Sequence, residues 1–203
     1  LLAFPMTGQA ADPAPVVKAE RAFAADGQTM GWVAAFRKHT APDGIMFAPD
    51  PVRTLDNMAK LGDAPRPTLN WWPLWAGMAG SGDLGFTTGP YTINGAPGGQ
   101  YFTVWVKQAD GRWAWVFDGG PDVDAPAMAP ASTQPGVLAA GVPSTIPWTR
   151  VTLAEDGLAQ NAYSDAAGAY RRVLAADARI AGIGKRIAVG DSQIESELKA
   201  RAK

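Results

Sequence analysis

The chain has 203 residues, of which 47% are hydrophobic and 18% charged, a balance typical of one complete globular domain and part of another. The formal net charge is -1, so no basic field exists to hold phosphate groups and we expect no nucleic acid partner. The absence of cysteine and the single histidine, His39, exclude disulfides, thiolate metal sites and multi-histidine sites. We therefore expect no metal and no cofactor.

The first residues resemble the end of a secretory signal peptide. The chain does not begin with Met, and an apolar start leads into the small residues Gly8-Gln9-Ala10, after which cleavage could occur. We predict that residues 1–14 are a signal-peptide remnant or a disordered N-terminus, and that the protein is periplasmic or secreted in a bacterium. No apolar run is long enough to span a bilayer, so we expect no membrane span.

Two helices, a strand and a third helix are predicted before residue 63. Gly27 is expected to stop the first helix and Thr29 to cap the second, which ends near Gly44. Residues 45–48 form a short strand, and Asp50-Pro51 begins a third helix. The apolar faces of the first two helices are predicted to consist of Val16, Ala19, Phe23, Trp32, Ala35 and Phe36.

Strands follow, and most of the eight tryptophans lie in them. Residues 68–72 are predicted to form an edge strand, because Pro73 interrupts it. Residues 84–93 form the next strand and residues 94–99 a loop. A hairpin then turns at Asp110-Gly111, which we interpret as a two-residue turn between runs of alternating β-branched and aromatic residues.

The two-residue turn sets a register for this hairpin. It pairs Gln108 with Trp113, Val106 with Trp115, Val104 with Phe117 and Thr103 with Asp118. One face then carries Phe102, Val104, Val106, Trp113, Trp115 and Phe117. The other face carries Tyr101, Thr103, Trp105, Lys107, Ala114, Val116 and Asp118. Neither face alternates with charged residues, so we expect both to be covered, and the second is the better candidate for a pocket or an interface.

A family resemblance rests on three runs in this region. They are Asn70-Trp-Trp-Pro73, Ser81-Gly-Asp-Leu-Gly-Phe-Thr-Thr-Gly89, and Tyr101-Phe-Thr-Val-Trp105 with Asp110-Gly-Arg-Trp113 and Phe117-Asp-Gly119. From about residue 16 to 120 the chain resembles the ketosteroid-isomerase-like and SnoaL-like group of the nuclear transport factor 2-like superfamily, and bacterial domains of unknown function within it.

The resemblance implies an α+β fold, a cone-shaped barrel in which a curved antiparallel sheet wraps around helices and leaves an apolar cavity at its wide end. Members of the superfamily include isomerases, cyclases, dehydratases, ligand-binding domains and adaptor domains. The characterised isomerases use a carboxylate base with a tyrosine and an acidic partner. No residue of that triad can be matched by motif position here.

The chain changes character after Gly120. Residues 15–120 are predicted to form the barrel domain and residues 121–147 a Pro/Ala-rich linker. In residues 148–203, Ala169–Asp177 parallels Ala35–Asp43, which suggests an internal repeat: a partial second domain resembling the start of the first. The alternative is an unrelated helical tail, and one continuous helix over 153–200 would contradict the repeat.

For the site, we predict that Tyr101, Thr103, Trp105 and Asp118, with Trp72 nearby, line a cavity for a small apolar molecule. In the alternative, Asp118 caps the sheet end and the aromatic residues are core or dimer interface. Burial of Asp118 would raise its pKa and make it a candidate general base.

Three function classes remain open. The first is a non-enzymatic domain that binds an apolar small molecule, and the second is an isomerase-, dehydratase- or cyclase-like enzyme that uses Asp118. The third is an interaction module: a homodimer through the sheet, or a pseudo-dimer with the C-terminal region.

Overall fold

The computed structural model describes residues 11–48, 50–61, 65–123, 128–138, 147–181 and 187–201. The chain divides into two compact units, Leu1–Pro121 with Ala125–Val142, and Asp122–Asp124 with Pro143–Lys203. The signal-peptide motif predicted at Gly8-Gln9-Ala10 lies outside the described residues. No helix among the described residues is long and apolar enough to cross a membrane.

The first unit begins with helices α1 (Ala14–Met30) and α2 (Trp32–His39). The predictions that Gly27 stops the first helix and that Thr29 caps the second are wrong, because α1 runs through both residues. The break falls at Gly31, whose φ of 82° is unfavourable for other residues. The carbonyl of Gly31 accepts a hydrogen bond from the Ala35 amide and so starts α2.

A hairpin and a third helix follow. Strand β1 (Thr40–Phe47) pairs antiparallel with β2 (Pro51–Arg53), and α3 (Thr54–Lys60) comes directly after. The third helix predicted from Asp50-Pro51 therefore starts too early. Pro51 pairs with Phe47 at the start of β2, an end position at which a strand tolerates proline.

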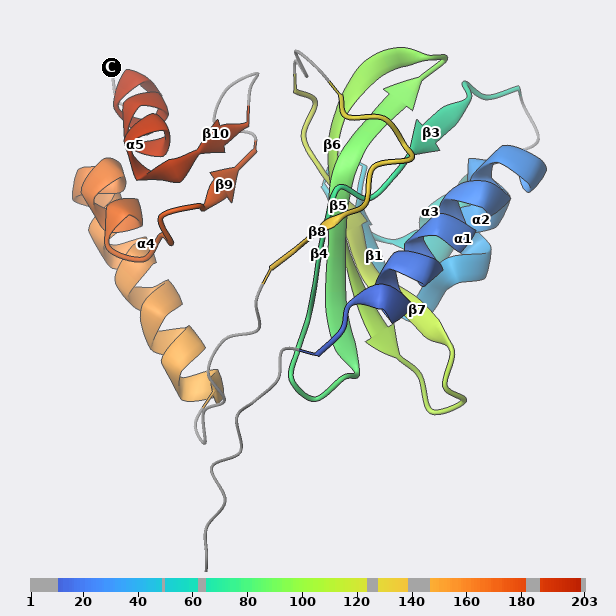
Figure 1. The fold of residues 1–203 in the computed structure, drawn as a ribbon, viewed down its shortest axis with the longest axis horizontal. Helices are drawn as coiled ribbons and strands as arrows, with labels where there is room; N and C mark the ends of the chain where they lie inside the picture. The colour runs from blue at the N-terminus through green and yellow to red at the C-terminus, as the bar shows by residue number, and fades with distance from the viewer. Residues whose placement is uncertain are drawn as a thin grey trace, which may run out of the picture. The chain divides into compact units, whose positions relative to one another are not determined.

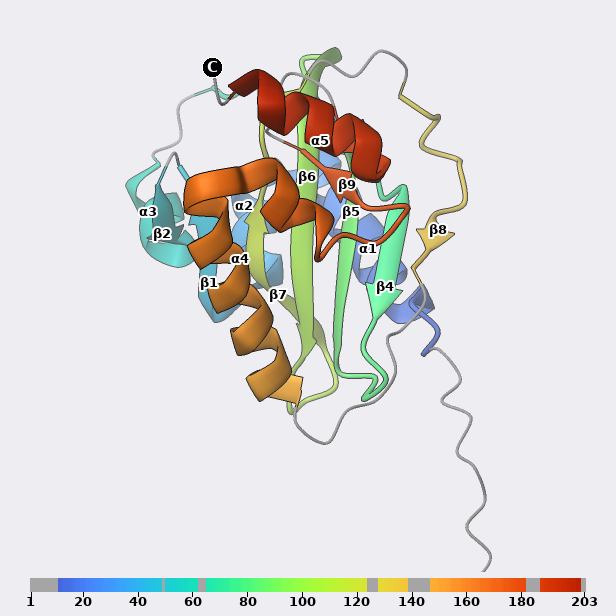
Figure 2. The ribbon, with the colours of Figure 1, turned by 90° about the vertical axis from the view of Figure 1, so that its left-hand side faces the viewer.

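The main sheet has eight strands in the order β2-β1-β7-β6-β5-β4-β8, with β3 paired to β5. The remaining strands are β3 (Leu69–Trp71), β4 (Trp75–Met78), β5 (Leu84–Ile93), β6 (Ala96–Lys107), β7 (Trp113–Gly119) and β8 (Gly136–Val137). Pairing is antiparallel except between β1 and β7 and between β4 and β8. Helices α1, α2 and α3 cover one face of this sheet (Figure 1), and the strand order can be followed in Figure 2. The predicted α+β cone fold is confirmed, with a sheet that does not close.

The loop predicted at residues 94–99 is largely strand. Asn94 and Gly95 both have positive φ, 50° and 81°, and Ile93 pairs directly with Ala96. This is the two-residue turn in which both central residues are left-handed, which Asn-Gly favours most. Strand β5 itself has the predicted bounds.

The predicted register of the β6–β7 hairpin is wrong near the turn and right farther away. The Gly111 amide donates to the Gln108 carbonyl and Gly111 has a φ of 82°, so the loop is longer than two residues. Lys107, not Gln108, therefore pairs with Trp113. An irregularity between Val104 and Trp105 restores the predicted pairs Val104 with Phe117 and Thr103 with Asp118.

The shifted register moves two tryptophans to the other face. Trp115 pairs with Trp105, and both are fully buried in the core with Phe23 and Phe36. Trp113 packs against the same core. On the other face Phe102 is 40% exposed and stacks on Phe86 at a centroid distance of 5.2 Å, and the expectation that this face is covered stays a prediction.

The predicted linker is not merely a spacer. Its residues Gly136 and Val137 form β8, which pairs in parallel with Trp75 and Ala76 of β4. The Ala129 carbonyl also accepts a hydrogen bond from the Trp72 indole. This segment therefore contributes to the first unit.

The second unit contains α4 (Pro147–Arg171), β9 (Arg179–Ile180), β10 (Ala188–Val189) and α5 (Gly190–Arg201). Helix α4 is kinked at Asp165, and β9 and β10 pair antiparallel. The continuous helix that would contradict the internal repeat is therefore absent from the described residues. Helix, break, helix, strand pair and helix is also the order that opens the first unit, and the repeat stays a prediction.

Gly27 provides a test of how closely α1 packs on the sheet. A Cβ at this position would lie 2.6 Å from the Trp71 ring, which is buried. An exposed helical Gly→Ala change stabilises by about 0.5–1 kcal/mol, whereas Gly27→Ala should destabilise by about 1–3 kcal/mol because the ring must move. Urea unfolding measures the difference. Gly157→Ala in α4, where a Cβ meets nothing within 4 Å, is the control and should be neutral or stabilising.

Candidate functional site

A cavity of about 250 Å³ lies within the first unit. Helices α1 and α2 and strands β1, β3, β5, β6 and β7 contribute its walls. The lining residues are Phe23, Trp32, Phe36, Met46, Phe47, Leu69, Trp71, Tyr91, Tyr101, Asp118, Gly119 and Gly120. Aromatic and aliphatic side chains with a few polar groups are typical of a small-molecule site.

Asp118 supplies the one carboxyl group among the residues that line this cavity. It lies on β7 opposite Thr103, whose Oγ1 donates a hydrogen bond of 2.6 Å to its Oδ1. Burial raises the pKa of Asp118 from 3.8 to about 6, against the smaller opposing effect of the Thr103 hydrogen bond. Both protonation states are therefore accessible near neutral pH.

Tyr101 provides a second polar group on the same wall. The residue is 6% exposed, and its buried hydroxyl lies close to the Thr87 side chain. Burial, with the nearby charges of Glu20 and Asp118, raises the pKa of Tyr101 well above 10, against a smaller lowering by the Thr87 side chain. The hydroxyl therefore stays neutral and remains a hydrogen-bond donor.

A second carboxyl, Glu20, is fully buried on α1 beside this wall. It accepts hydrogen bonds from Trp71 Nε1 at 2.7 Å, from Trp105 Nε1 at 3.2 Å and from the Thr87 hydroxyl. Burial raises the pKa of Glu20 from 4.5 to about 7 despite these donors, and the charge of Asp118 adds to the rise. Glu20 does not line the cavity, but Trp71 does.

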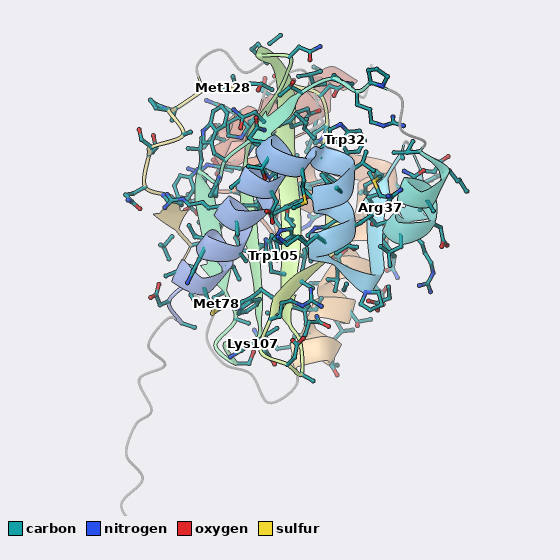
Figure 3. All side chains as sticks on the ribbon, turned by 90° about the vertical axis from the view of Figure 1, so that its right-hand side faces the viewer. Trp32, Arg37, Met78, Trp105, Lys107 and Met128 are labelled. Atoms are coloured by element: carbon teal, nitrogen blue, oxygen red, sulfur yellow. The ribbon has the colours of Figure 1, made fainter. Side chains whose placement is uncertain are left out.

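The placement of Glu20 follows from the helix period. Val16, Glu20, Phe23 and Gly27 are the buried positions of α1 and share one face. Gly27 allows the Trp71 ring to approach the helix, where the indole reaches Glu20. Figure 3 shows Trp105 lying behind α1, between the helix and the sheet.

The structure separates the predicted site residues into three groups. Tyr101 and Asp118 line the cavity. Thr103 and Trp105 are fully buried behind the wall, where Thr103 holds Asp118 and Trp105 donates to Glu20 and Thr87. Trp72 does not line the cavity, and its indole donates to the Ala129 carbonyl.

Sequence reasoning missed the aromatic residues that reach the cavity from the helices, and it missed Glu20. A carboxylate within the apolar stripe between Val16 and Phe23 was the available signal. Such a residue is almost never buried without partners. Tryptophan indoles in the sheet are donors that can satisfy it.

His39 does not line the cavity, and its polar contacts lie elsewhere in the first unit. His39 Nε2 lies 2.6 Å from Asp26 Oδ2, and Lys38 Nζ lies 2.7 Å from the same oxygen. This cluster joins α1 to the end of α2 and does not line the cavity. The described residues contain no group of histidine and acidic side chains that could hold a metal ion.

No family model and no curated protein matches the chain. Solved structures with a similar fold include a ketosteroid isomerase-like protein from Shewanella frigidimarina, 20% identical, which covers 50% of this chain and 93% of its own, with a TM-score of 0.36. An NTF2-like protein of unknown function from Pseudomonas putida is 11% identical, covers 61% and 96%, and has a TM-score of 0.42. An LEH-like epoxide hydrolase of M. tuberculosis is 16% identical, covers 53% and 83%, and has a TM-score of 0.36.

The fold class rests on the element order and the sheet described above. The first unit is an α+β cone domain with an apolar cavity, and the neighbours say nothing of its ligand or activity.

The raised pKa of Glu20 predicts a pH-dependent stability. Between the usual pKa of 4.5 and about 7, folded Glu20 keeps a proton that the unfolded chain has lost. The free energy of unfolding therefore falls as the pH rises through this window. Glu20→Gln removes the titration of this carboxyl, and the groups that its charge does not reach titrate as before. The difference between wild type and variant should fall by about 2 to 3 kcal/mol from pH 5 to pH 8. Urea unfolding at both pH values measures it, and a constant difference would contradict the burial of an ionisable Glu20.

Proposed function

We propose that the first unit binds a small, mainly apolar molecule that carries one polar oxygen. The observation that supports this most directly is the pair of polar residues, Tyr101 and Asp118, on the wall of an otherwise apolar cavity. Asp118 supplies an acceptor when ionised and a donor when protonated. A cavity of about 250 Å³ suits a molecule of one or two rings.

The polar pair sets the orientation of this ligand. The neutral Tyr101 hydroxyl donates to a carbonyl or hydroxyl oxygen, while Phe23, Phe36 and Trp71 enclose the apolar part. Trp71 is held by its hydrogen bond to Glu20, and its ring packs edge to face on Phe23 at 4.8 Å. The wall is therefore formed before the ligand arrives, which lowers the entropic cost of binding.

Native mass spectrometry tests binding. The purified chain should carry a mass increment that is lost on denaturation, or it should form a one-to-one complex with 2-tetralone, a two-ring ketone. Tyr101→Phe should weaken the tetralone complex about fivefold, the value of one neutral hydrogen bond. Tyr163→Phe changes a tyrosine that is 98% exposed and should have no effect. Absence of both an increment and a complex would contradict the proposal.

A second candidate is proton transfer by Asp118. With a pKa of about 6 its carboxyl is roughly 90% ionised at pH 7, and it remains basic enough to remove a proton next to a carbonyl. The Tyr101 hydroxyl on the same wall would then donate to the oxygen on which charge develops. This pair favours isomerisation or dehydration over hydrolysis through a covalent intermediate.

Deuterium exchange distinguishes an enzyme from a binding domain. The protein should accelerate deuterium uptake into 2-tetralone in D₂O, with a rate that rises through about pH 6 as Asp118 ionises. Asp118→Asn should lower the accelerated rate by about 10²-fold or more, and Asp110→Asn in the exposed turn should not. Binding of 2-tetralone without any acceleration of exchange would contradict the enzyme and support the non-enzymatic binding domain.

Dimerisation through the sheet and export remain proposals as well. Leu84 and Phe102 are 44% and 40% exposed, which would suit a partner surface. The native mass spectrum recorded for the binding test also gives the oligomeric state.

A further inference from the structure

A polar groove borders the apolar cavity. It encloses about 440 Å³ and is lined by residues of α1 and α2 and of the segment that leads into β3. Trp32 and Leu69 line both the groove and the cavity. These two side chains therefore form the boundary between the cavity and the groove, and a ligand that spans both spaces has to displace them.

Cations are the only ionisable groups that line the groove among the described residues: Arg37 and Arg66. The guanidinium of Arg66 lies over the Trp32 ring, 5.8 Å from its centroid. Arg37 donates to the Met58 carbonyl, which fixes the place of its charge on α2, and Figure 3 shows Trp32 and Arg37 on this helix. Two fixed positive charges beside an aromatic ring favour an anion.

The indole nitrogen of Trp32, at the boundary of the two spaces, is buried and has no acceptor among the described residues. The two arginines are the groups that an anion in the groove would face. The cavity wall disfavours the same anion, because Asp118 lines it and is ionised above a pH of about 6.

We propose that the ligand is an apolar carboxylic acid, bound as the carboxylate. Its ring system occupies the cavity, and its carboxylate lies in the groove near Trp32, Arg37 and Arg66. This inference rests on the proposed function and adds the chemical class and direction of the ligand.

Calorimetric titration with two matched probes tests the class. 2-Naphthoate and 2-naphthamide share their ring system and differ in charge. The wild-type protein should bind the naphthoate about fivefold more tightly at ~20 mM NaCl, since exposed ion pairs contribute modestly. The preference should shrink at ~500 mM NaCl because salt screens it.

Arginine variants test whether the carboxylate of the ligand binds in the groove. Arg66→Gln should remove most of the naphthoate preference and leave naphthamide binding unchanged, and Arg37→Gln should act in the same direction. Arg21→Gln is the matched control, because Arg21 is exposed on α1 and lines neither space. Retained naphthamide binding shows that each variant keeps the cavity intact.

The outcomes separate this inference from the proposed function. Naphthamide binding with no naphthoate preference overturns the carboxylate class and leaves the cavity function standing. A preference that survives Arg66→Gln combined with Arg37→Gln, or that Arg21→Gln also removes, places the anion elsewhere and overturns the inference. Failure of both probes to bind overturns the inference, whereas the proposed function is decided by the bound mass increment and the 2-tetralone complex.

Discussion

The first unit depends on a buried carboxyl that joins its first helix to its sheet. The Glu20 carboxyl accepts hydrogen bonds from Trp71 on β3, Thr87 on β5 and Trp105 on β6. Burying a carboxyl without partners would cost several kcal/mol, so the donors are required wherever this residue is buried. The hydrogen bonds also fix the direction of two indoles that apolar packing alone would leave less determined.

The hydrogen bonds to Glu20 help to determine the shape of the cavity, because they position a side chain that lines it. Trp71 reaches Glu20 with its indole nitrogen and presents its ring to the cavity. Gly27 makes that approach possible, since any side chain there would meet the ring. The Thr103 and Asp118 pair works in the same way one strand farther along, with the hydroxyl buried and the carboxyl on the wall. Polar pairs behind the wall thus position the groups that a ligand would contact.

Features that depend on local sequence pattern were predicted correctly, whereas features that depend on turn length and strand register were not. Strand β5 was predicted because turn residues bound it on both sides, and the α+β fold was predicted from the family resemblance. The β6–β7 register was wrong because the length of a turn at Asp110-Gly111 decides it, and a later irregularity corrects it. Tyr101 and Asp118 were predicted from their shared face, whereas Glu20 was missed because its partners lie on three different strands.

Both units contain a break between two helical segments, and the residue at the break differs between them. Aligning Phe36 with Tyr170, as the sequence parallel requires, places Gly31 opposite Asp165. Gly31 breaks its helix pair through a positive φ, whereas Asp165 has a φ of -150° and caps the next segment by accepting from the Gly168 amide at 2.9 Å. In both units the shorter helical segment leads into a strand pair, and a helix follows directly. Breaks at aligned positions are what the predicted repeat requires, and the repeat itself stays a prediction.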